Sequence, residues 1–396
     1  MKTCCKNANP LDIEQIRPSV YNLITDKYRR KDYSKFISEY CNYSPKEIRT
    51  FEKYQLDEPI ENICKAIIEM IENRKLEFKP VHYSVREDPC SHKKRRIGVE
   101  HPLMQCTEHV AKDLLSELWQ KKLEFHQYAT IKGKGQVKGA KQIRTWVLIE
   151  RRTHKVYFVK LDVIKCFQSI KHSVVMRYLK RDIGKNKLLL WLIESLLEFH
   201  GNGLLEPEEE TDDGLIIGSI LSQFICNYLM SYAMRFAYAL AKTRRDKRIP
   251  MVQHQLFYMD DILLMGSSKS NLSIATKRLI SFIENDLELS VKDDWSVKDI
   301  DDEPIDMMGF RIFAGGRMDI RPRTFLRARR CYLNGHKNGF KIHTARRATA
   351  YYGYFKHARI NHLSTDQGKT FRITTLKLKA SKIVSQYDKE ALSCDK

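Results

Sequence analysis

Two short apolar runs flank a pair of acidic residues in the second half of the chain. Residues 256–265 read Leu-Phe-Tyr-Met-Asp-Asp-Ile-Leu-Leu-Met, so Asp260 and Asp261 separate two stretches suited to buried strands. The pattern predicts a tight β-hairpin with both carboxylates at its turn. Two adjacent negative charges are costly to hold together unless a cation neutralises them. The hairpin therefore indicates a metal site at its turn.

A second β-rich run, residues 157–163, ends close to Asp162 and precedes a turn that contains Phe167. Three carboxylates at the ends of two neighbouring strands could hold two Mg²⁺ ions about 4 Å apart, the arrangement used for in-line phosphoryl transfer. The carbonyl of Val163 could add a ligand, and Mn²⁺ could replace Mg²⁺. The ring of Phe167 has two interpretations. It could lie under the sugar of an incoming nucleotide and clash with a 2′-hydroxyl, or it could be a buried link from strand to helix.

Helical periodicity dominates much of the remaining chain. Ser44, Pro45 and Glu47 have the spacing of a capping box with proline at the first helical position. Isoleucines spaced three and four apart between 60 and 71 predict a helix that packs against the core. Pro18 is expected to break a helical segment over 11–43. Further helices are expected over 103–122, 137–148, 172–181, 185–200, from about 222 to 241, and over 271–287.

Composition and charge narrow the class of partner. The 396 residues are 42% hydrophobic, enough for a large core and two or three subdomains. The 70 basic and 49 acidic residues give a net charge of +21, which predicts a polyanion, nucleic acid ahead of an anionic membrane surface. No apolar run approaches the roughly 20 residues that span a bilayer, and no signal core is present, so a cytosolic protein is expected. The ten cysteines show no disulfide framework, which fits a reducing compartment.

One group of metal-binding residue types does not predict a metal site. Cys90, His92, His101 and Cys106 are suitable zinc ligands by type, but their spacing matches no common structural zinc pattern. Structural zinc is therefore not expected there.

Like-charge runs occur at three places. Residues 93–96 are four cations in an expected turn after a strand, and we favour phosphate contact over a simple solvated loop. Residues 206–213 are mostly acidic and favour a solvated loop, with a gate over a nucleic-acid cleft as the alternative. Residues 321–365 contain many basic side chains and no acidic one. That segment is expected to grip a template–primer duplex, with binding that weakens steeply as salt rises.

The segment before the long apolar helix carries a glycine and two polar residues. Gly218 would let the backbone approach a ligand, while Ser222 and Gln223 could contact a base or a phosphate at the helix N-terminus. N-capping of the helix by Ser222 is the alternative interpretation.

These segments follow one another in an order that resembles the reverse transcriptases. The succession is the basic hairpin, Asp162 with Phe167, Gly218-x-x-x-Ser222-Gln223, Tyr258-Met259-Asp260-Asp261 and Met308-Gly309-Phe310. The resemblance covers about residues 79–356. Within that superfamily, the Ile217 to Gln223 form and the thumb-like residues 351–358 look like the reverse transcriptases of diversity-generating retroelements.

The resemblance implies an α/β (α+β) right-hand polymerase with fingers, a mixed-sheet palm and a helical thumb. Its expected parts are an N-terminal helical extension (1–78), fingers (79–154), palm (155–315, with a helical insertion at about 171–213) and basic thumb (316–396). It implies that Asp162, Asp260 and Asp261 are the catalytic carboxylates. The residues implied to bind nucleotide are Arg96, Phe167, Gln223 and Lys292, with Lys298 competing with Lys292 as the general acid for pyrophosphate. The fidelity motif is Ile217, Gly218, Ser222 and Gln223, and the primer or template contacts are Lys94, Arg95, Tyr258, Met259, Gly309, Arg323, Arg327 and Arg330.

The implied activity is that of an RNA-directed DNA polymerase, a nucleotidyltransferase, in mutagenic retrohoming. Such an enzyme copies a template-repeat RNA into cDNA with errors at template adenines, using dNTPs and holding an RNA/cDNA duplex. The resemblance implies a bacterial or phage-encoded cytoplasmic protein, with a basic, helical, oligomeric accessory protein as partner and no membrane. There are two alternatives. One is a retron, abortive-infection or CRISPR-associated reverse transcriptase, and the other is a non-catalytic RNA-binding protein on the same scaffold. No ribonuclease H, maturase or HNH segment is recognised, so initiation, cleavage and integration are expected to require other factors.

Overall fold

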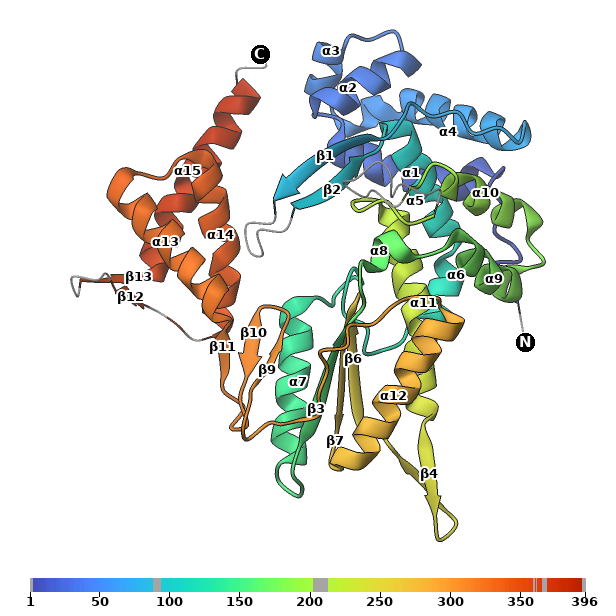
Figure 1. Cartoon of the computed structure of the whole chain (residues 1–396). Coiled ribbons are helices and arrows are strands. Elements are labelled where there is room, and N and C mark those ends of the chain that lie inside the picture. Colours follow the sequence, from blue (N-terminus) through green and yellow to red (C-terminus); the bar gives the residue numbers. More distant parts are fainter. Residues whose placement is uncertain are drawn as a thin grey trace. The chain divides into compact units, whose positions relative to one another are not determined.

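The computed structural model describes residues 3–87, 94–201, 213–358, 360, 362–364 and 369–393 (Figure 1). Helices and small sheets both occur along the chain, which confirms the expected mixed α/β fold. The chain forms two compact units. The first comprises Met1–Thr130, Lys160–Ile262 and Ile274–Trp295, and the second comprises Ile131–Val159, Leu263–Ser273 and Ser296–Lys396. Within the described ranges, no helix is both long enough and apolar enough to cross a bilayer.

The first unit is mainly helical, and its helices bury apolar faces against one another. Its α-helices are α1 (Ile13–Lys27), α2 (Lys31–Ile37), α3 (Pro45–Thr50), α4 (Asp57–Glu72), α5 (Pro102–Leu114), α6 (Ser116–Lys122), α8 (Cys166–Ser169), α9 (His172–Ile183), α10 (Lys187–Leu197), α11 (Ile220–Ala239) and most of α12 (Lys269–Asp286). Two short 3₁₀ turns, η1 (Ser38–Tyr40) and η2 (Lys53–Leu56), lie between them.

The two sharpest helix predictions near the N-terminus are confirmed. The Ser44 hydroxyl accepts the Glu47 backbone N–H at 3.3 Å, and the Glu47 carboxylate accepts the Ser44 N–H at 2.7 Å, which completes the capping box of α3. In α4, Ile60, Ile63 and Ile67 are fully buried on one face. The three- and four-residue spacing was therefore sufficient to predict the packed face.

The expected helix break at Pro18 is wrong, because this proline lies inside α1. Proline removes one backbone hydrogen bond, but Ile16 before it and Val20 and Ile24 after it are all fully buried. Burial of that continuous apolar face outweighs the lost bond. The helix expected over 103–122 is instead two helices, α5 and α6, which meet at Leu115.

A four-stranded sheet has the order β6-β7-β3-β8. Its strands are β6 (His254–Tyr258), β7 (Asp261–Gly266), β3 (Tyr157–Asp162) and β8 (Lys298–Asp299). The neighbours β6 and β7 are joined by only Met259 and Asp260, so the hairpin predicted over 256–265 is confirmed. Most residues of β7 are buried, as expected from its apolar sequence.

The hairpin of β1 (His82–Glu87) and β2 (Lys94–Val99) is antiparallel, with Tyr83 opposite Gly98 and Arg86 opposite Arg95. Lys94, Arg95 and Arg96 were expected in a turn, but they are the first residues of β2. The residues that join the strands, 88–93, lie outside the described ranges.

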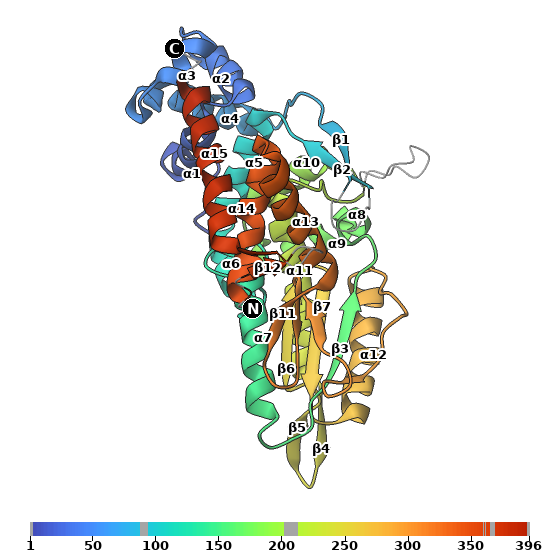
Figure 2. The same cartoon turned by 90° about the vertical axis from the view of Figure 1, so that its left-hand side faces the viewer.

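A second basic hairpin, β4 (Ala241–Arg244) and β5 (Lys247–Pro250), follows α11 and was not expected from the sequence. Arg245 and Asp246 form its two-residue turn with φ angles of +49° and +58°, the left-handed pair that glycine and asparagine usually provide. Figures 1 and 2 both show this hairpin extending beyond β6. Its strands contribute no fully buried side chain.

The second unit combines a three-stranded sheet with packed helices. Its elements are α7 (Gln136–Glu150), β9 (Ile305–Met307), β10 (Phe310–Ile312), β11 (Met318–Ile320), α13 (Pro322–Asn338), α14 (Ile342–His357), β12 (His362–Ser364), β13 (Thr370–Arg372) and α15 (Ile373–Ser393). Tyr332 and Phe355 are fully buried in the core that α13, α14 and α15 share. Residues 322–393 of the described chain are thus largely helical, and the division into fingers, palm and thumb stays a prediction.

Candidate functional site

The three aspartates predicted to be catalytic lie at the ends of adjacent strands, and all three belong to the first unit. Asp162 ends β3, Asp260 lies in the turn after β6, and Asp261 begins β7. The Val163 backbone N–H donates to the Asp260 carbonyl at 3.2 Å, which joins the two strand ends directly. Met259, in the same turn, has a φ of +53°, a left-handed conformation that is uncommon for a side chain of its size. The tight turn therefore holds both hairpin carboxylates beside the end of β3.

The pKa of Asp260 is shifted by its surroundings. Burial, followed by the negative charges of Asp261 and Asp162, raises this pKa to about 6, while Arg95 of β2 opposes the shift. Burial and the two neighbouring carboxylates therefore both disfavour the charged form of Asp260. Arg95 is close enough to lower the pKa of Asp260 slightly, and its contact with primer or template stays a prediction.

Two lysines pair with the other two carboxylates. Lys292 contacts Asp162, and the Lys160 ammonium lies 3.1 Å from Asp261. Both lysine side chains are about one-third exposed, 37% and 33%, so neither is locked in the interior. Lys298, the competing candidate for the general acid, instead pairs with Glu303 at 2.8 Å. Of the two candidates for the general acid, Lys292 and Lys298, Lys292 is therefore the one that contacts a predicted catalytic aspartate.

The donor atoms at this site suit a hard divalent cation. Carboxylate and carbonyl oxygens are the ligands that Mg²⁺ prefers. Across the described residues, no hydrogen bond to the Val163 carbonyl occurs, so that oxygen is available as a ligand. Because the pKa of Asp260 is raised, a bound cation would stabilise the charged form of its carboxylate. The residues therefore fit the predicted metal, and the identity of the ligands stays a prediction.

Phe167 lies on α8, one turn after Asp162, and its side chain is half-buried. Its backbone carbonyl accepts the Leu215 N–H at 2.7 Å, which ties α8 to the segment that precedes α11. The ring is thus neither fully exposed nor part of the fully buried core. Its role at the sugar of an incoming nucleotide stays a prediction.

The Ile217 to Gln223 segment packs against β2. The Gly98 N–H donates to the Ile217 carbonyl at 3.2 Å, and Gly218 has a φ of +124° with its backbone against Gly98. A Cβ at Gly218 would lie 3.0 Å from the Gly98 carbonyl oxygen. The positive φ angle and the short distance to Gly98 both disfavour a residue with a Cβ at position 218. Gly218 was expected to let the backbone approach a ligand. In this structure it lets the backbone approach Gly98 of β2.

The N-cap of α11 is Ser219, not Ser222 as the alternative interpretation held. The Ser219 hydroxyl accepts the Ser222 backbone N–H at 3.2 Å. Ser222 is fully buried, so its hydroxyl faces other protein groups, whereas the side chain of Gln223 is half-buried. Of the two polar residues expected to contact a nucleotide, only Gln223 is partly accessible to one.

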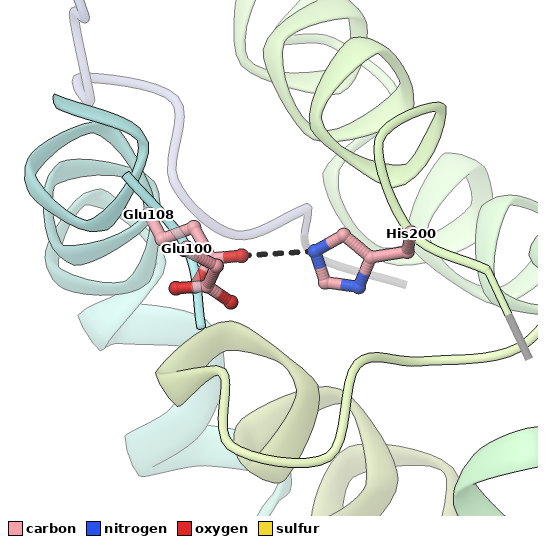
Figure 3. Close-up of side chains that lie close together, drawn as sticks. All are labelled: Glu100, Glu108 and His200. Atoms are coloured by element: carbon pink, nitrogen blue, oxygen red, sulfur yellow. Dashed lines mark hydrogen bonds and ion pairs between the residues drawn. The ribbon is translucent and has the colours of Figure 1, made fainter. Parts of the chain in front are cut away.

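A buried polar cluster close to this segment was not recognised in the sequence. Glu100, Glu108 and His200 point toward one another (Figure 3), and Glu108 and His200 are hydrogen-bonded at 2.9 Å. The Ser219 hydroxyl donates to Glu108 at 2.6 Å. Burial, more than the charge of Glu108, raises the pKa of Glu100 to about 9. No motif links these residues, because Glu108 and His200 are 92 positions apart.

The predicted nucleic-acid contacts are distributed over both units. In β2, Lys94 and Arg95 are exposed, and the Arg96 guanidinium lies 4.2 Å from the centre of the Tyr83 ring. Tyr258, at the end of β6, is half-buried. These placements leave the cations accessible to phosphates, and the contacts themselves stay predictions.

In the second unit, Gly309 and Met308 form the turn between β9 and β10 with positive φ angles of +83° and +54°. On α13, Arg323 and Arg330 are exposed and Arg327 is half-buried, with its Nη1 atom lacking a hydrogen-bond partner. These three arginines are four and three positions apart, so they share one face of the helix.

The group of zinc-type residues and the acidic run 206–213 are each described only in part. His101 caps α5 by accepting the Leu103 N–H at 3.4 Å, and Cys106 is fully buried in that helix. Cys90 and His92 lie outside the described residues, as does the acidic run up to residue 212. Asp213, the last residue of that run, accepts the His172 N–H at 2.9 Å.

Comparison with known proteins defines the class of this chain. Residues 85–312 match the family described as reverse transcriptase (RNA-dependent DNA polymerase). The match covers more than half of the chain, so the chain belongs to the reverse transcriptase family. This confirms the enzyme class predicted from the order of the sequence motifs. The matched segment includes all three aspartates and the Ile217 to Gln223 segment.

Individual relatives are distant. A stretch of 139 residues is 25% identical to the COX1/OXI3 intron 1 protein of Saccharomyces cerevisiae, which is 34% of this chain and 16% of that protein. Apo telomerase from Candida tropicalis is 11% identical with a TM-score of 0.46, over 72% of this chain and 58% of that one. Telomerase from Candida albicans bound to a TWJ fragment of telomeric RNA is 13% identical with a TM-score of 0.44, over 81% and 61%. The chain thus spans 16% of the yeast protein and about three-fifths of each telomerase chain.

Proposed function

We propose that this protein is the RNA-directed DNA polymerase of a diversity-generating retroelement. The observation that carries the polymerase activity is the joining of three carboxylates at two strand ends within a reverse transcriptase domain. The Ile217 to Gln223 sequence supports the particular class, since it resembles that of diversity-generating retroelements. The substrates are then a template-repeat RNA and dNTPs, and the product is an adenine-mutagenised cDNA.

The reaction joins an incoming dNTP to the primer 3′ end. The primer 3′ oxygen forms a bond to the α-phosphorus, and the bond from that phosphorus to the pyrophosphate oxygen breaks. Asp162, Asp260 and Asp261, with the Val163 carbonyl, would hold two Mg²⁺ ions. Bound there, the ions supply a clamp for the attacking and leaving oxygens. Lys292, which contacts Asp162, would donate a proton to the departing pyrophosphate oxygen.

The remaining predicted residues bind and orient the substrates. Phe167 lies under the sugar of the incoming nucleotide, and Gln223 lies against that nucleotide or the templating base. Arg96 contacts the triphosphate, while Tyr258 and Met259 lie under the primer end. Loosening the contact at the Ile217 to Gln223 segment lowers the discrimination between right and wrong nucleotides, which is the proposed origin of the low fidelity.

The carboxylate assignment is tested with Asp260→Asn. This variant keeps the shape of the side chain and removes a charge from the metal ligands, so dNTP incorporation on an RNA template should become undetectable. RNA affinity, measured on the same preparation, should change by only a few-fold. Asp301→Asn is the matched control, because Asp301 is exposed and pairs with Arg151 at 2.6 Å. Full incorporation by the Asp260 variant would refute the assignment.

The retroelement class is tested by sequencing the cDNA. The purified enzyme should misincorporate mainly at template adenines, and a small basic protein encoded beside its gene should raise the yield of that cDNA. A template repeat and a variable repeat should occur near the gene. Errors spread evenly over all four template bases, without such repeats, would favour a retron, abortive-infection or CRISPR-associated enzyme. A protein that binds RNA but makes no cDNA would instead be a non-catalytic relative.

A further inference from the structure

Three metal-binding side chains meet in the interior of the first unit, in the cluster formed by Glu100, Glu108 and His200. They come from the end of the β1–β2 hairpin, from α5 and from the residues after α10. One possible ligand atom from each lies within 4.8 Å of the others. The residues are 6%, 0% and 2% exposed, so the cluster is closed to solvent. None of the three predicted catalytic aspartates contributes to it.

We propose that this buried cluster binds one Zn²⁺ ion that serves structure and is separate from the catalytic metals. Glutamate oxygens and histidine nitrogens are both zinc ligands, and the Ser219 hydroxyl, 2.6 Å from Glu108, is a further oxygen beside the cluster. Mg²⁺ takes oxygen ligands and keeps several waters, so an imidazole in a closed site favours zinc.

The hydrogen bonds around the cluster leave one carboxyl oxygen without a partner. The Oε1 atom of Glu100 is buried and has no hydrogen-bond partner. An unpaired buried carboxyl oxygen destabilises the folded state, and the cost is larger when the group is charged. A metal ion among the three side chains would give this oxygen a partner.

The charge of the cluster is also unbalanced. The catalytic Asp162 and Asp261 each pair with a lysine, but within the described part of the chain neither Glu100 nor Glu108 forms an ion pair with lysine or arginine. His200 is the basic group in contact with Glu108. Two adjacent buried glutamates therefore need either a shared proton or a cation, and a cation also uses the free oxygen of Glu100.

His200 also links the cluster to the start of α11. Its Nδ1 atom accepts the Ile216 N–H at 3.4 Å and lies 3.4 Å from the Ser222 hydroxyl. With Nδ1 accepting, Nε2 carries the proton that it donates to Glu108, and a zinc ion would displace that proton. Ser219 and Ser222 both belong to the start of α11. The ion would therefore fasten the Ile217 to Gln223 segment to α5 and to the end of β2.

Metal content provides the first test. The full chain, purified without added zinc and dialysed against Mg²⁺ buffer, should retain about one zinc per molecule by elemental mass spectrometry. The catalytic variant Asp260→Asn should retain the same amount, because its metal site is a different one. Glu108→Gln should weaken Zn²⁺ binding at least tenfold in a chelator competition. Glu124→Gln, which alters a glutamate paired with Arg235 outside the cluster, should bind zinc normally.

Glu100→Gln separates the ion from a shared proton. A glutamine amide can donate a hydrogen bond to Glu108 as a protonated carboxyl would, but it is a poor zinc ligand. If zinc holds the cluster, this variant loses zinc and melts at a lower temperature, and added Zn²⁺ no longer raises its melting temperature. The proposal is overturned if the wild-type chain contains no zinc, is indifferent to added Zn²⁺, and melts at the same temperature as Glu100→Gln. Neither readout depends on polymerisation, so this result is independent of the proposed function.

Discussion

The ring of Phe167 is the single side chain whose proposed role can be tested most directly by activity. Phe167→Ala removes the group proposed to clash with a 2′-hydroxyl, so ribonucleotides should be incorporated more readily. A steric contact of this kind typically contributes about 1–3 kcal/mol, which corresponds to a rise of about 10- to 200-fold in the rNTP to dNTP ratio of kcat/KM. Phe125→Ala is the control, because Phe125 is 72% exposed. An unchanged ratio would show that Phe167 only packs strand to helix.

At the residue scale, the sequence predicted those functional side chains that a local sequence pattern places at the end of a strand. Asp162, Asp260 and Asp261 were recognisable because each ends or begins an apolar run, and a strand end has a defined place in a sheet. The cluster of Glu108 and His200 was not recognisable. Its members lie on separate segments, and only the tertiary packing of those segments brings the side chains together.

Asp182 joins several helices of the first unit, and its removal should loosen them. Its carboxylate, 1% exposed, accepts hydrogen bonds from Tyr228 at 2.8 Å and from Tyr232, and it pairs with Lys122 at 3.0 Å. Burial alone would raise the pKa of Asp182, but the bonds from Tyr232, Lys122 and Tyr228 hold it below its ordinary value of 3.8. Asp182→Asn should therefore lower the free energy of unfolding by about 2–3 kcal/mol in urea titrations at neutral pH.

The pH dependence of that loss follows from the lowered pKa. The charged form of Asp182 is favoured by folding, so its contribution is fully present above the ordinary aspartate pKa and is lost as the pH falls through the lower folded-state pKa. The difference between wild type and Asp182→Asn should shrink below a pH of about 4. Asp32→Asn, in an exposed pair with Arg30, should change stability by less than about 0.5 kcal/mol. A difference that is constant down to pH 2 would contradict the assignment.

At the scale of elements, capping signals and periodicity were reliable where they were explicit. Ser44 and Glu47 fixed the start of α3, and the apolar spacing of α4 gave its buried face. Pro18 misled because a helix can continue through a proline when both sides of it are buried. The β4–β5 hairpin was missed because its turn is Arg245-Asp246 and not one of the asparagine–glycine pairs that identify such turns in a sequence.

For the whole molecule, the net charge predicts a polyanionic partner but not the positions of the contacts. The charge of +21 agrees with membership of a family that acts on nucleic acid. The two compact units also divide β3, β7 and α12 between them, which apolar runs alone do not reveal. Whether the charge acts as a diffuse field or through particular helices is a separate question, and α13 allows a test.

Replacing Arg323, Arg327 and Arg330 with glutamine should weaken binding to an RNA/DNA template–primer and make it less sensitive to salt. Each phosphate contact contributes close to one unit to the slope of log affinity against log salt, so the slope should fall by about 2–3 if these arginines contact phosphates. The control is a triple glutamine variant of Lys35, Lys46 and Lys53, three exposed cations of the N-terminal helices. It removes the same total charge, so a diffuse field predicts equal losses in the two variants. A local phosphate grip on α13 predicts a loss in the arginine variant alone, and equal slopes in a fluorescence-anisotropy salt titration would contradict that grip.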